Sequence, residues 1–421
     1  MVLSVIIVNY RVRHFLEVCL HSVQKALTGI GVSEIIVVDN NSGDGSVETL
    51  QPLFPGVRFV GNLENVGFAK ANNQALALAS GEYILFLNPD TILAEDFARV
   101  CLDFLREEAE AAMGRPEGAS QAWPGGRGIG ALGVRMVDGS GRFLPESRRG
   151  FPSPWVAFTR LSGLSALFPR SRTFARYYLG HLRADRAHPA PVLSGACLLV
   201  RRGILDEVGG FDERFFMYAE DIDLSYRIEK AGYINYYFPG TTIVHFKGES
   251  TQKDIRYVRQ FHKAMSQFRR KHFNRGLPAL WNLVMEAGIW VRAGISGLGR
   301  AVGGSRTSDP GVQPSVLSVQ PGSRDGRPET IAPVSRIRVV GDPAEASWVK
   351  NALRPPLVED IHEATVVLFC QGQAFSFGEC ITALETGGFE QGGRRALFHA
   401  AGTHSAVGSS DRDGRGETLV F

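Results

Sequence analysis

The segment YILFLNPD, residues 83–90, decides the fold of the first part of this chain. Five consecutive apolar or aromatic residues end abruptly in Asn88, Pro89 and Asp90. Continuous apolar strands of this length are typical of parallel sheets that are covered by helices on both faces. The polar residues therefore mark the carboxyl end of a buried strand, which is where ligands collect in open α/β sheets.

The same pattern occurs twice before this segment. Apolar runs at residues 3–8 and 34–38 end in Asn9-Tyr10 and in Asp39-Asn40-Asn41, and helical patterns separate the strands. Alternating strands and helices predict an α/β domain with a mostly parallel sheet. Because the carboxyl ends of parallel strands meet at one edge, these polar residues are expected to lie together.

Composition excludes several classes of protein. The net charge of +3 over 421 residues gives no strong field for a polyanion, so we expect no nucleic-acid partner. The five cysteines are scattered and form no C-x-x-C pair, which favours reduced thiols in a cytoplasmic protein. The apolar N-terminus lacks a basic region and runs directly into Asn9, so it reads as a strand and not as a signal peptide. The sequence contains no run of about 20 apolar residues, so we expect no transmembrane helix.

The chain divides into four segments by pattern. We expect a catalytic domain at residues 1–275, an amphipathic helix at 276–300, a disordered linker at 301–333 and a smaller α/β domain at 334–421. Within the first domain, the Gly- and Pro-rich residues 114–130 are expected to form a mobile loop. The smaller domain carries no dinucleotide-binding fingerprint, so its role stays open.

The helix expected at residues 276–300 has two interpretations. It has a broad apolar face with Trp281 and Trp290, and a basic segment precedes it. Such a helix suits the surface of an anionic membrane, where a lipid-linked acceptor would be presented; the alternative is packing on the core of the protein.

Four acidic or metal-binding residues, in three places along the chain, are candidates for catalysis or metal binding. Asp90 at a strand end suits a metal ligand, although an ordinary Asx-Pro turn explains it as well. Glu220 and Asp221 lie in a run of acids and aromatic residues, which would partly desolvate a general base. His245 leaves a strand into a loop, where it is either a ligand or a structural histidine.

Together these residues closely resemble glycosyltransferase family 2, in particular its bacterial rhamnosyltransferase-like branch. Seven pieces match in order and spacing over about residues 3–272: VIIVNY at 5–10, VVDNNS at 37–42, ENVGFAKANN at 64–73, LNPD at 87–90, LSGA at 193–196, ED at 220–221, and His245. The resemblance implies an inverting enzyme with a GT-A-type fold, in which helices cover both faces of a mostly parallel sheet.

The resemblance also implies roles for individual residues. Asp221 would be the general base with Glu220 beside it, and Asp90 and His245 would hold Mg²⁺ or Mn²⁺. The residues that would bind the donor nucleotide and its diphosphate are Asn9, Tyr10, Asp39, Asn65, Gly67, Asn72 and Asn88. Asn88 stands where many members have a second acid, so the metal would have one carboxylate fewer.

The acceptor side is less defined by the sequence. Arg148 and Arg149 could grip a phosphate of a lipid-linked acceptor, or they could form a solvated basic turn. Trp155 and Gly195 are further candidates for contact with the acceptor.

The expected function is transfer of rhamnose or another hexose from a dTDP- or UDP-sugar to a lipid-linked or saccharide acceptor, in cell-surface polysaccharide synthesis. We expect this to take place in the cytoplasm, at the cytoplasmic face of the inner membrane. A nucleotidyltransferase of related fold is one alternative, but residues 9–14 lack the glycine that its phosphate loop would need. An inactive sugar-binding scaffold is another, although both Asp90 and Asp221 are present.

Overall fold

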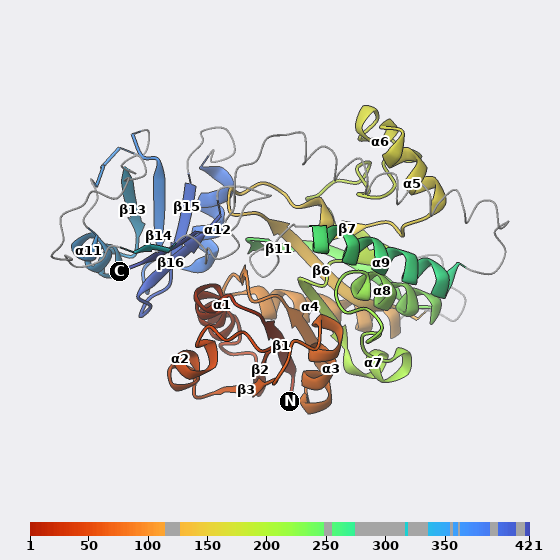
Figure 1. Cartoon of the computed structure of the whole chain (residues 1–421), viewed down its shortest axis with the longest axis horizontal. Helices are drawn as coiled ribbons and strands as arrows, with labels where there is room; N and C mark the ends of the chain where they lie inside the picture. Colours follow the sequence, from red (N-terminus) through yellow and green to blue (C-terminus); the bar gives the residue numbers. More distant parts are fainter. Residues whose placement is uncertain are drawn as a thin grey trace.

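In its described residues, the computed structural model contains two large β-sheets with helices packed on them, and a third sheet of two strands (Figure 1). It describes residues 1–113, 127–247, 255–273, 316–318, 336–353, 357–360, 363–387, 395–409 and 417–421. The larger sheet has nine strands and belongs to the N-terminal part, and a six-stranded sheet follows in the C-terminal part. The expected α/β class is confirmed for both.

The larger sheet begins as a parallel sheet and continues as a mixed one. Its main order is β3-β2-β1-β4-β10-β6-β11-β5, and β8 pairs with β11. The first four strands along the chain are β1 (Leu3–Asn9), β2 (Ser33–Asp39), β3 (Val57–Gly61) and β4 (Tyr83–Leu87). The others are β5 (Thr91–Ile92), β6 (Ile129–Val137), β8 (His188–Pro189), β10 (Cys197–Arg201) and β11 (Ile234–His245). The antiparallel pairing of β10 with β4 ends the parallel half.

Helices cover both faces of this sheet because β1 is apolar on both. Leu3, Val5 and Ile7 face a core that includes α1 (Arg13–Ala26) and α4 (Phe97–Met113). Ile6 and Val8 face the opposite core, which includes α3 (Phe68–Leu78), α7 (Arg202–Val208) and α8 (Glu220–Lys230). Alternation of side chains along a strand thus produces the three layers.

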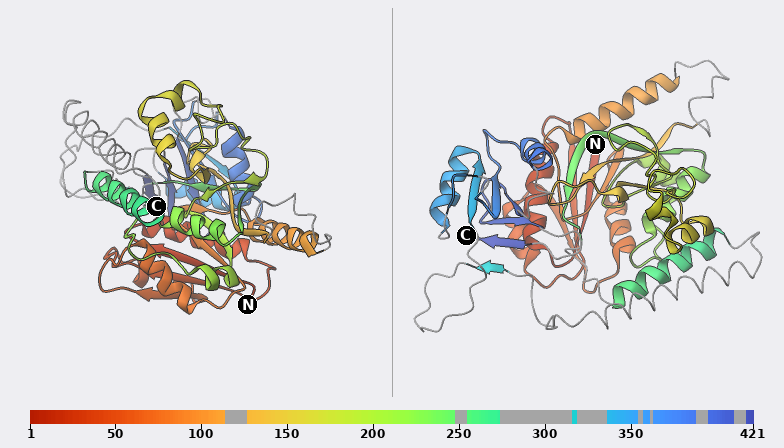
Figure 2. Two further views of the ribbon diagram at one scale, coloured as in Figure 1. Left: turned by 90° about the vertical axis from the view of Figure 1, so that its right-hand side faces the viewer. Right: turned by 90° about the horizontal axis from the view of Figure 1, so that it is seen from above.

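Further helices lie at the periphery of this domain. They are α2 (Ser46–Leu53), α5 (Pro154–Leu161), α6 (Leu164–Leu167) and α9 (Ile255–His272). Seen from above, α4 and α9 lie on opposite sides of the molecule (Figure 2). A short 3-10 turn, Pro145–Ser147, leads into β7 (Arg148–Arg149), which pairs only with β9 (Val192–Leu193).

The smaller sheet has the order β12-β17-β16-β15-β14-β13. Its strands are β12 (Val316–Ser318), β13 (Ile337–Gly341), β14 (Val366–Cys370), β15 (Arg395–His399), β16 (Ser405–Gly408) and β17 (Glu417–Val420), with helices α11 (Pro343–Ala352) and α12 (Phe377–Thr386). β12 lies within the range expected to be a linker, and it pairs with β17 in parallel.

The two domains share a hydrophobic core. Phe246, which follows β11, packs edge-on against Phe15 of α1 and Phe398 of β15, with ring centroids 5.2 and 5.7 Å away. Glu95 accepts hydrogen bonds from the backbone N–H groups of Phe377 and Gly378, at 2.6 and 2.9 Å, at the start of α12. A carboxylate is well placed there, because the first N–H groups of a helix lack partners within it. The smaller domain therefore packs directly behind the end of β11.

Several expected segments lie outside the described residues. These are the amphipathic helix at 276–300, most of the linker at 301–333, and residues 114–126 of the expected loop. Among the residues that are described, no helix is both long and apolar enough to cross a membrane.

Candidate active site

The carboxyl ends of β1 and β2 form a rigid polar edge. Asn9 donates a hydrogen bond from Nδ2 to Oδ1 of Asp39 at 2.7 Å. Ser42 donates to both Asp39 oxygens, from its hydroxyl at 2.5 Å and from its backbone N–H at 3.0 Å. All three side chains are buried. Tyr10 follows β1, and the guanidinium of Arg11 lies 5.1 Å from the centre of its ring.

A second group of amides fixes the loop between β3 and α3. Asn40 donates to Oδ1 of Asn65 at 2.9 Å, and the same oxygen accepts the backbone N–H of Gly67 at 3.0 Å. Gly67 has φ of +89°, and an added Cβ would lie 2.6 Å from the carbonyl oxygen of Phe216, so a side chain cannot fit. Asn72 is buried within α3, where it donates to the carbonyl of Phe68.

Asn40 was expected among the polar residues at the end of the second strand, but neither Asn40 nor Ser42 was assigned a role in the site from the sequence. Both lie in the DNNS stretch that follows β2. The sequence feature that could have identified them is their position directly after a strand end, beside Asp39.

The short strand β5 brings Asp90 and His245 together. β5 pairs antiparallel with the end of β11, so Thr91 lies opposite His245, and Phe246 donates its N–H to the carbonyl of Asp90 at 3.0 Å. His245 Nε2 lies 3.4 Å from Asp90 Oδ1 and 3.4 Å from Asn88 Nδ2. Asp90 and His245 are both buried.

This pair suits a divalent cation that also binds a diphosphate. Asp90 Oδ1 is buried and has no hydrogen-bond partner. Mg²⁺ and related ions are often held by one or two protein groups while the substrate phosphates and water complete the coordination. One carboxylate and one imidazole, with the amide of Asn88 beside them, fit that pattern. The described residues contain no group of three or more His, Cys, Asp or Glu side chains that could hold a metal by themselves.

Asp221 lies at the start of α8 and is held from three directions. Arg149 Nη2 donates to its Oδ2 at 2.5 Å, and the N–H of Gly195 donates to the same oxygen at 3.2 Å. The N–H of Ile222 donates to Oδ1 at 2.8 Å. A Cβ added to Gly195 would lie 3.2 Å from Cβ of Asp221, so this glycine allows the close approach. The carboxylate is thus oriented, charge-paired and 9% exposed as a residue.

The neighbouring acid has a different environment. Glu220 is 7% exposed and its Oε2 has no hydrogen-bond partner. Burial, reinforced by the charge of Asp221, raises the pKa of Glu220 well above its usual range and so favours the protonated form. Asp221, by contrast, has the guanidinium of Arg149 as its counter-charge. Of the two acids, Asp221 is the one arranged to accept a proton.

The turn before these acids is strained. Tyr218 and Ala219 have φ of +70° and +65°, in the left-handed region that residues with a Cβ rarely adopt. Strained backbone of this kind persists where the surroundings determine it and is concentrated at functional sites. Here it delivers Glu220 and Asp221 into the first turn of α8.

The structure separates the two arginines that follow Pro145–Ser147. Arg149 points to Asp221, and although burial lowers its pKa, the Asp221 carboxylate and Tyr177 raise it above its usual range. Arg148 is buried on the other side of β7 and donates to the carbonyl of Leu182 at 2.8 Å. Trp155 lies on α5 with 41% of its surface exposed.

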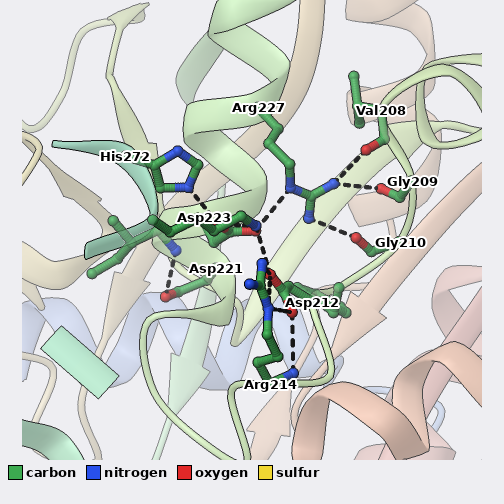
Figure 3. A network of polar contacts seen from close by, with 12 residues as sticks. Val208, Gly209, Gly210, Asp212, Arg214, Asp221, Asp223, Arg227 and His272 are labelled. Carbon is green, nitrogen blue, oxygen red and sulfur yellow. Dashed lines mark hydrogen bonds and ion pairs between the residues drawn. The ribbon is translucent and has the colours of Figure 1, made fainter. Parts of the chain in front are cut away.

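A third acid of this segment holds α8 and α9 together (Figure 3). Asp223 is fully buried and accepts hydrogen bonds from Arg227 at 2.8 Å and from Lys271 and His272 at 2.6 Å each. Arg227 also donates to the carbonyls of three residues at the end of α7, Val208, Gly209 and Gly210. Asp223 is therefore a structural acid, distinct from the two before it.

We expect the Asp223→Asn substitution to lower the free energy of unfolding by about 3 kcal/mol, because Arg227 and Lys271 would lose a buried counter-charge. Burial raises the pKa of Asp223, but its hydrogen bonds with Lys271, His272 and Arg227 outweigh burial and lower it below 3.8. A folded-state pKa below the unfolded-state value means that the stabilisation is present at neutral pH and lost as the pH falls below about 4. Denaturant unfolding from pH 7 to pH 3 measures this.

The matched control is Asp103→Asn on α4, since the Asp103 side chain is 46% exposed and its ion pairs have N–O distances of 3.5 and 4.0 Å. It is expected to change stability by less than about 1 kcal/mol. Equal effects of the two substitutions at pH 7 would contradict the structural role of Asp223.

Asp90 with His245 forms one centre at this edge of the sheet, and Asp221 with Arg149 forms a second. Residues 194–196 connect the two centres. Ala196 accepts the N–H of Asn88 at 2.9 Å, while Gly195 donates to Asp221. One centre can neutralise a leaving diphosphate and the other can take a proton from an attacking hydroxyl. These two roles, on a parallel sheet with an antiparallel extension, are the ones that transfer of a sugar from a nucleoside-diphosphate donor requires.

Comparison with known proteins gives the family. A model described as glycosyl transferase family 2 matches residues 4–209, and one described as glycosyl transferase family group 2 matches residues 145–300. N-acetylglucosaminyl-diphospho-decaprenol L-rhamnosyltransferase of Mycobacterium tuberculosis is 33% identical over 268 residues, which cover 60% of this chain and 78% of that protein. Rhamnosyltransferase WbbL of Escherichia coli is 26% identical over 191 residues, covering 43% and 61%. The chain belongs to glycosyl transferase family 2, in its rhamnosyltransferase-like branch.

Solved structures show only a distant likeness. Residues 1–349 of Staphylococcus aureus TarS align with a TM-score of 0.42 and 17% identity, over 72% of this chain and 74% of that one. Mannosyltransferase PcManGT from Pyrobaculum calidifontis, solved in complex with GDP-Man and Mn²⁺, aligns with a TM-score of 0.43 and 18% identity, over 72% and 76%. Family membership therefore carries the conclusion that this chain is a glycosyltransferase, and it does not support the nucleotidyltransferase and scaffold alternatives.

Proposed function

We propose that this enzyme transfers a sugar from a nucleoside-diphosphate donor to a lipid-linked saccharide acceptor, with inversion at the anomeric carbon. The observation that carries the proposal is the oriented, arginine-paired Asp221, connected through residues 194–196 to the end of β4. A single base and a separate centre for the leaving group suit one in-line displacement. Most of the acceleration would come from positioning and electrostatics.

The donor binds at the carboxyl ends of β1, β2 and β4 in this proposal. Asn9 and Asp39 would hold the nucleoside base beside Tyr10, and the loop with Asn65 and Gly67 would shape the ribose and diphosphate pocket. Asn72 would act from within α3, by fixing the start of that helix through the carbonyl of Phe68.

Asp90 and His245 would hold Mg²⁺ or Mn²⁺, with Asn88 beside them. The ion would neutralise charge on the departing diphosphate. On the acceptor side, Asp221 would accept the proton of the attacking hydroxyl, and protonated Glu220 would avoid a second negative charge beside it. Gly195 would leave space for the acceptor next to Asp221.

The names of two relatives support a choice of substrates. One relative's name specifies L-rhamnosyl transfer to N-acetylglucosaminyl-diphospho-decaprenol, and another is named a rhamnosyltransferase. We propose dTDP-rhamnose as donor and a polyprenyl-diphosphate saccharide as acceptor, used in cell-surface polysaccharide synthesis at the cytoplasmic face of the membrane. Arg149 would then act on the base and not on a phosphate, and the buried position of Arg148 favours a structural role.

Thermal unfolding with a panel of nucleotide sugars tests the donor. A donor that binds only the folded state raises the unfolding temperature by mass action, by an amount that grows with its concentration over its Kd. We expect dTDP-rhamnose with Mn²⁺ to give a larger shift than UDP-glucose, GDP-mannose or dTDP-rhamnose with chelator. A larger shift with another sugar would replace rhamnose in the proposal, and no shift with any donor would contradict it.

A further inference from the structure

An exposed cluster of aromatic residues and arginines lies on α5, α6 and the segment that follows them. Its large apolar members have 37–72% of their surface exposed: Trp155, Phe158, Leu167, Phe168 and Tyr178. Its exposed arginines include Arg170, Arg172 and Arg176. We call these eight residues the α5–α6 patch. Figure 1 shows α5 and α6, in yellow, at the top of the view and away from both sheets.

The patch is an ordered surface and not a loose segment. Phe174 connects the two helices, because its ring lies 6.2 Å from that of Trp155 and 5.5 Å from that of Phe168. The indole N–H of Trp155 donates to the carbonyl of Thr173 at 2.9 Å. On α5, Val156 and Thr159 are buried, so this helix has an inner side, while Trp155 and Phe158 are exposed. Contiguous exposed apolar groups of this kind mark interaction sites.

The charge of this region is concentrated and of one sign. Residues 151–190 contain six arginines and a single acid, Asp185, which gives a net charge of +5 in a chain whose total is +3. Asp185 is itself paired with Arg183. The partner of the patch must therefore be both negatively charged and able to accept aromatic and aliphatic side chains.

The patch adjoins the candidate base. The N–H of Gly150 donates to the carbonyl of Tyr177 at 2.7 Å, and a Cβ added to Gly150 would lie 2.4 Å from the carbonyl oxygen of Arg176. Gly150 directly follows Arg149, which holds Asp221. A surface bound to the patch would thus lie close to the acceptor side of the enzyme.

We propose that the α5–α6 patch docks on an anionic lipid bilayer and so presents the lipid-linked acceptor to Asp221; this rests on the acceptor class proposed above. Trp, Tyr and Phe side chains favour the boundary between lipid headgroups and acyl chains. Arginines beside them gain from the negative surface potential of anionic lipids. A symmetric contact with a second copy is disfavoured, because it would bring two arginine clusters against each other.

Vesicle flotation of the full chain tests the proposal, with phosphatidylcholine vesicles that contain or lack phosphatidylglycerol. Wild type is expected to bind the anionic vesicles only. Leu167→Ser/Phe168→Ser and Arg170→Glu/Arg172→Glu are each expected to weaken binding about tenfold or more. These variants leave Trp155 and the catalytic residues intact. Their transfer to a water-soluble short-chain acceptor is expected to equal that of wild type.

Matched controls place the same changes elsewhere on the surface. Val32→Ser/Leu53→Ser and Arg58→Glu/Arg106→Glu change exposed residues outside the patch and should bind vesicles like wild type. Unchanged binding of the patch variants would overturn the proposal. A dimer in solution that the Leu167→Ser/Phe168→Ser variant dissociates, without vesicle binding by wild type, would also overturn it. If the proposed function itself is wrong, wild type will not transfer a sugar to the water-soluble acceptor, whatever its vesicle binding.

Discussion

Replacing Asp221 with asparagine is expected to lower the turnover of sugar transfer by about 10²–10⁴-fold, the usual contribution of a positioned general base. Asparagine has nearly the same shape, and its one side-chain oxygen can accept a hydrogen bond from either Gly195 or Ile222, but it cannot take the proton of the acceptor hydroxyl. Steady-state transfer with saturating donor and acceptor measures the loss. A variant that keeps the wild-type turnover would remove Asp221 from the role of base.

One further measurement on Asp221→Asn and one control variant separate loss of catalysis from loss of folding. Donor binding by calorimetry is expected to stay near the wild-type value, because the strand-end residues Asn9 and Asp39 are untouched. Glu220→Gln is the neighbouring control, and it is expected to retain far more activity than Asp221→Asn, because burial raises the pKa of Glu220 and favours its uncharged form. A larger loss of turnover in Glu220→Gln than in Asp221→Asn would indicate that Glu220 is the general base.

Asp90→Asn is expected to weaken Mn²⁺-dependent binding of the nucleoside diphosphate by about 100-fold, because the site would lose its only carboxylate and a metal ion supplies several kcal/mol of charge stabilisation. The buried Oδ1 of Asp90, without a hydrogen-bond partner, is the atom whose charge is removed. Calorimetric titration of the diphosphate, with Mn²⁺ and with chelator, measures the effect independently of turnover.

The control for this substitution is Asp96→Asn, which removes an exposed carboxylate from the segment after β5. We expect it to bind the diphosphate like wild type in both conditions. If Asp90→Asn loses no affinity with Mn²⁺, or loses the same factor with chelator, Asp90 is not a metal ligand.

Sequence patterns predicted the ends of the first strands well because strand ends are a local property. The apolar runs that end in Asn9, Asp39 and Asn88 became β1, β2 and β4, and their parallel register places these three residues at one edge. The proximity of Asp90 and His245 came from the family resemblance alone. It depends on the pairing of β5 with β11, which joins residues far apart in the chain.

Other features could not be read from periodicity. The ion pair between Arg149 and Asp221 depends on β7, a strand of two residues that has no sequence signal. The sequence offered a phosphate contact or a solvated turn for this arginine, and only tertiary structure shows the carboxylate next to it. The contact between the two sheets also could not be predicted from the sequence, because Phe246 and Phe398 have the same pattern as ordinary core residues.

The most direct test of the central claim is product analysis by mass spectrometry and NMR. The full chain is incubated with dTDP-rhamnose, Mn²⁺ and a polyprenyl-diphosphate-linked N-acetylglucosamine. We predict a product that is heavier than the acceptor by one deoxyhexose and has the anomeric configuration opposite to that of the donor. Asp221→Asn is expected not to form this product. A product with retained configuration, or release of free sugar without any acceptor product, would contradict it.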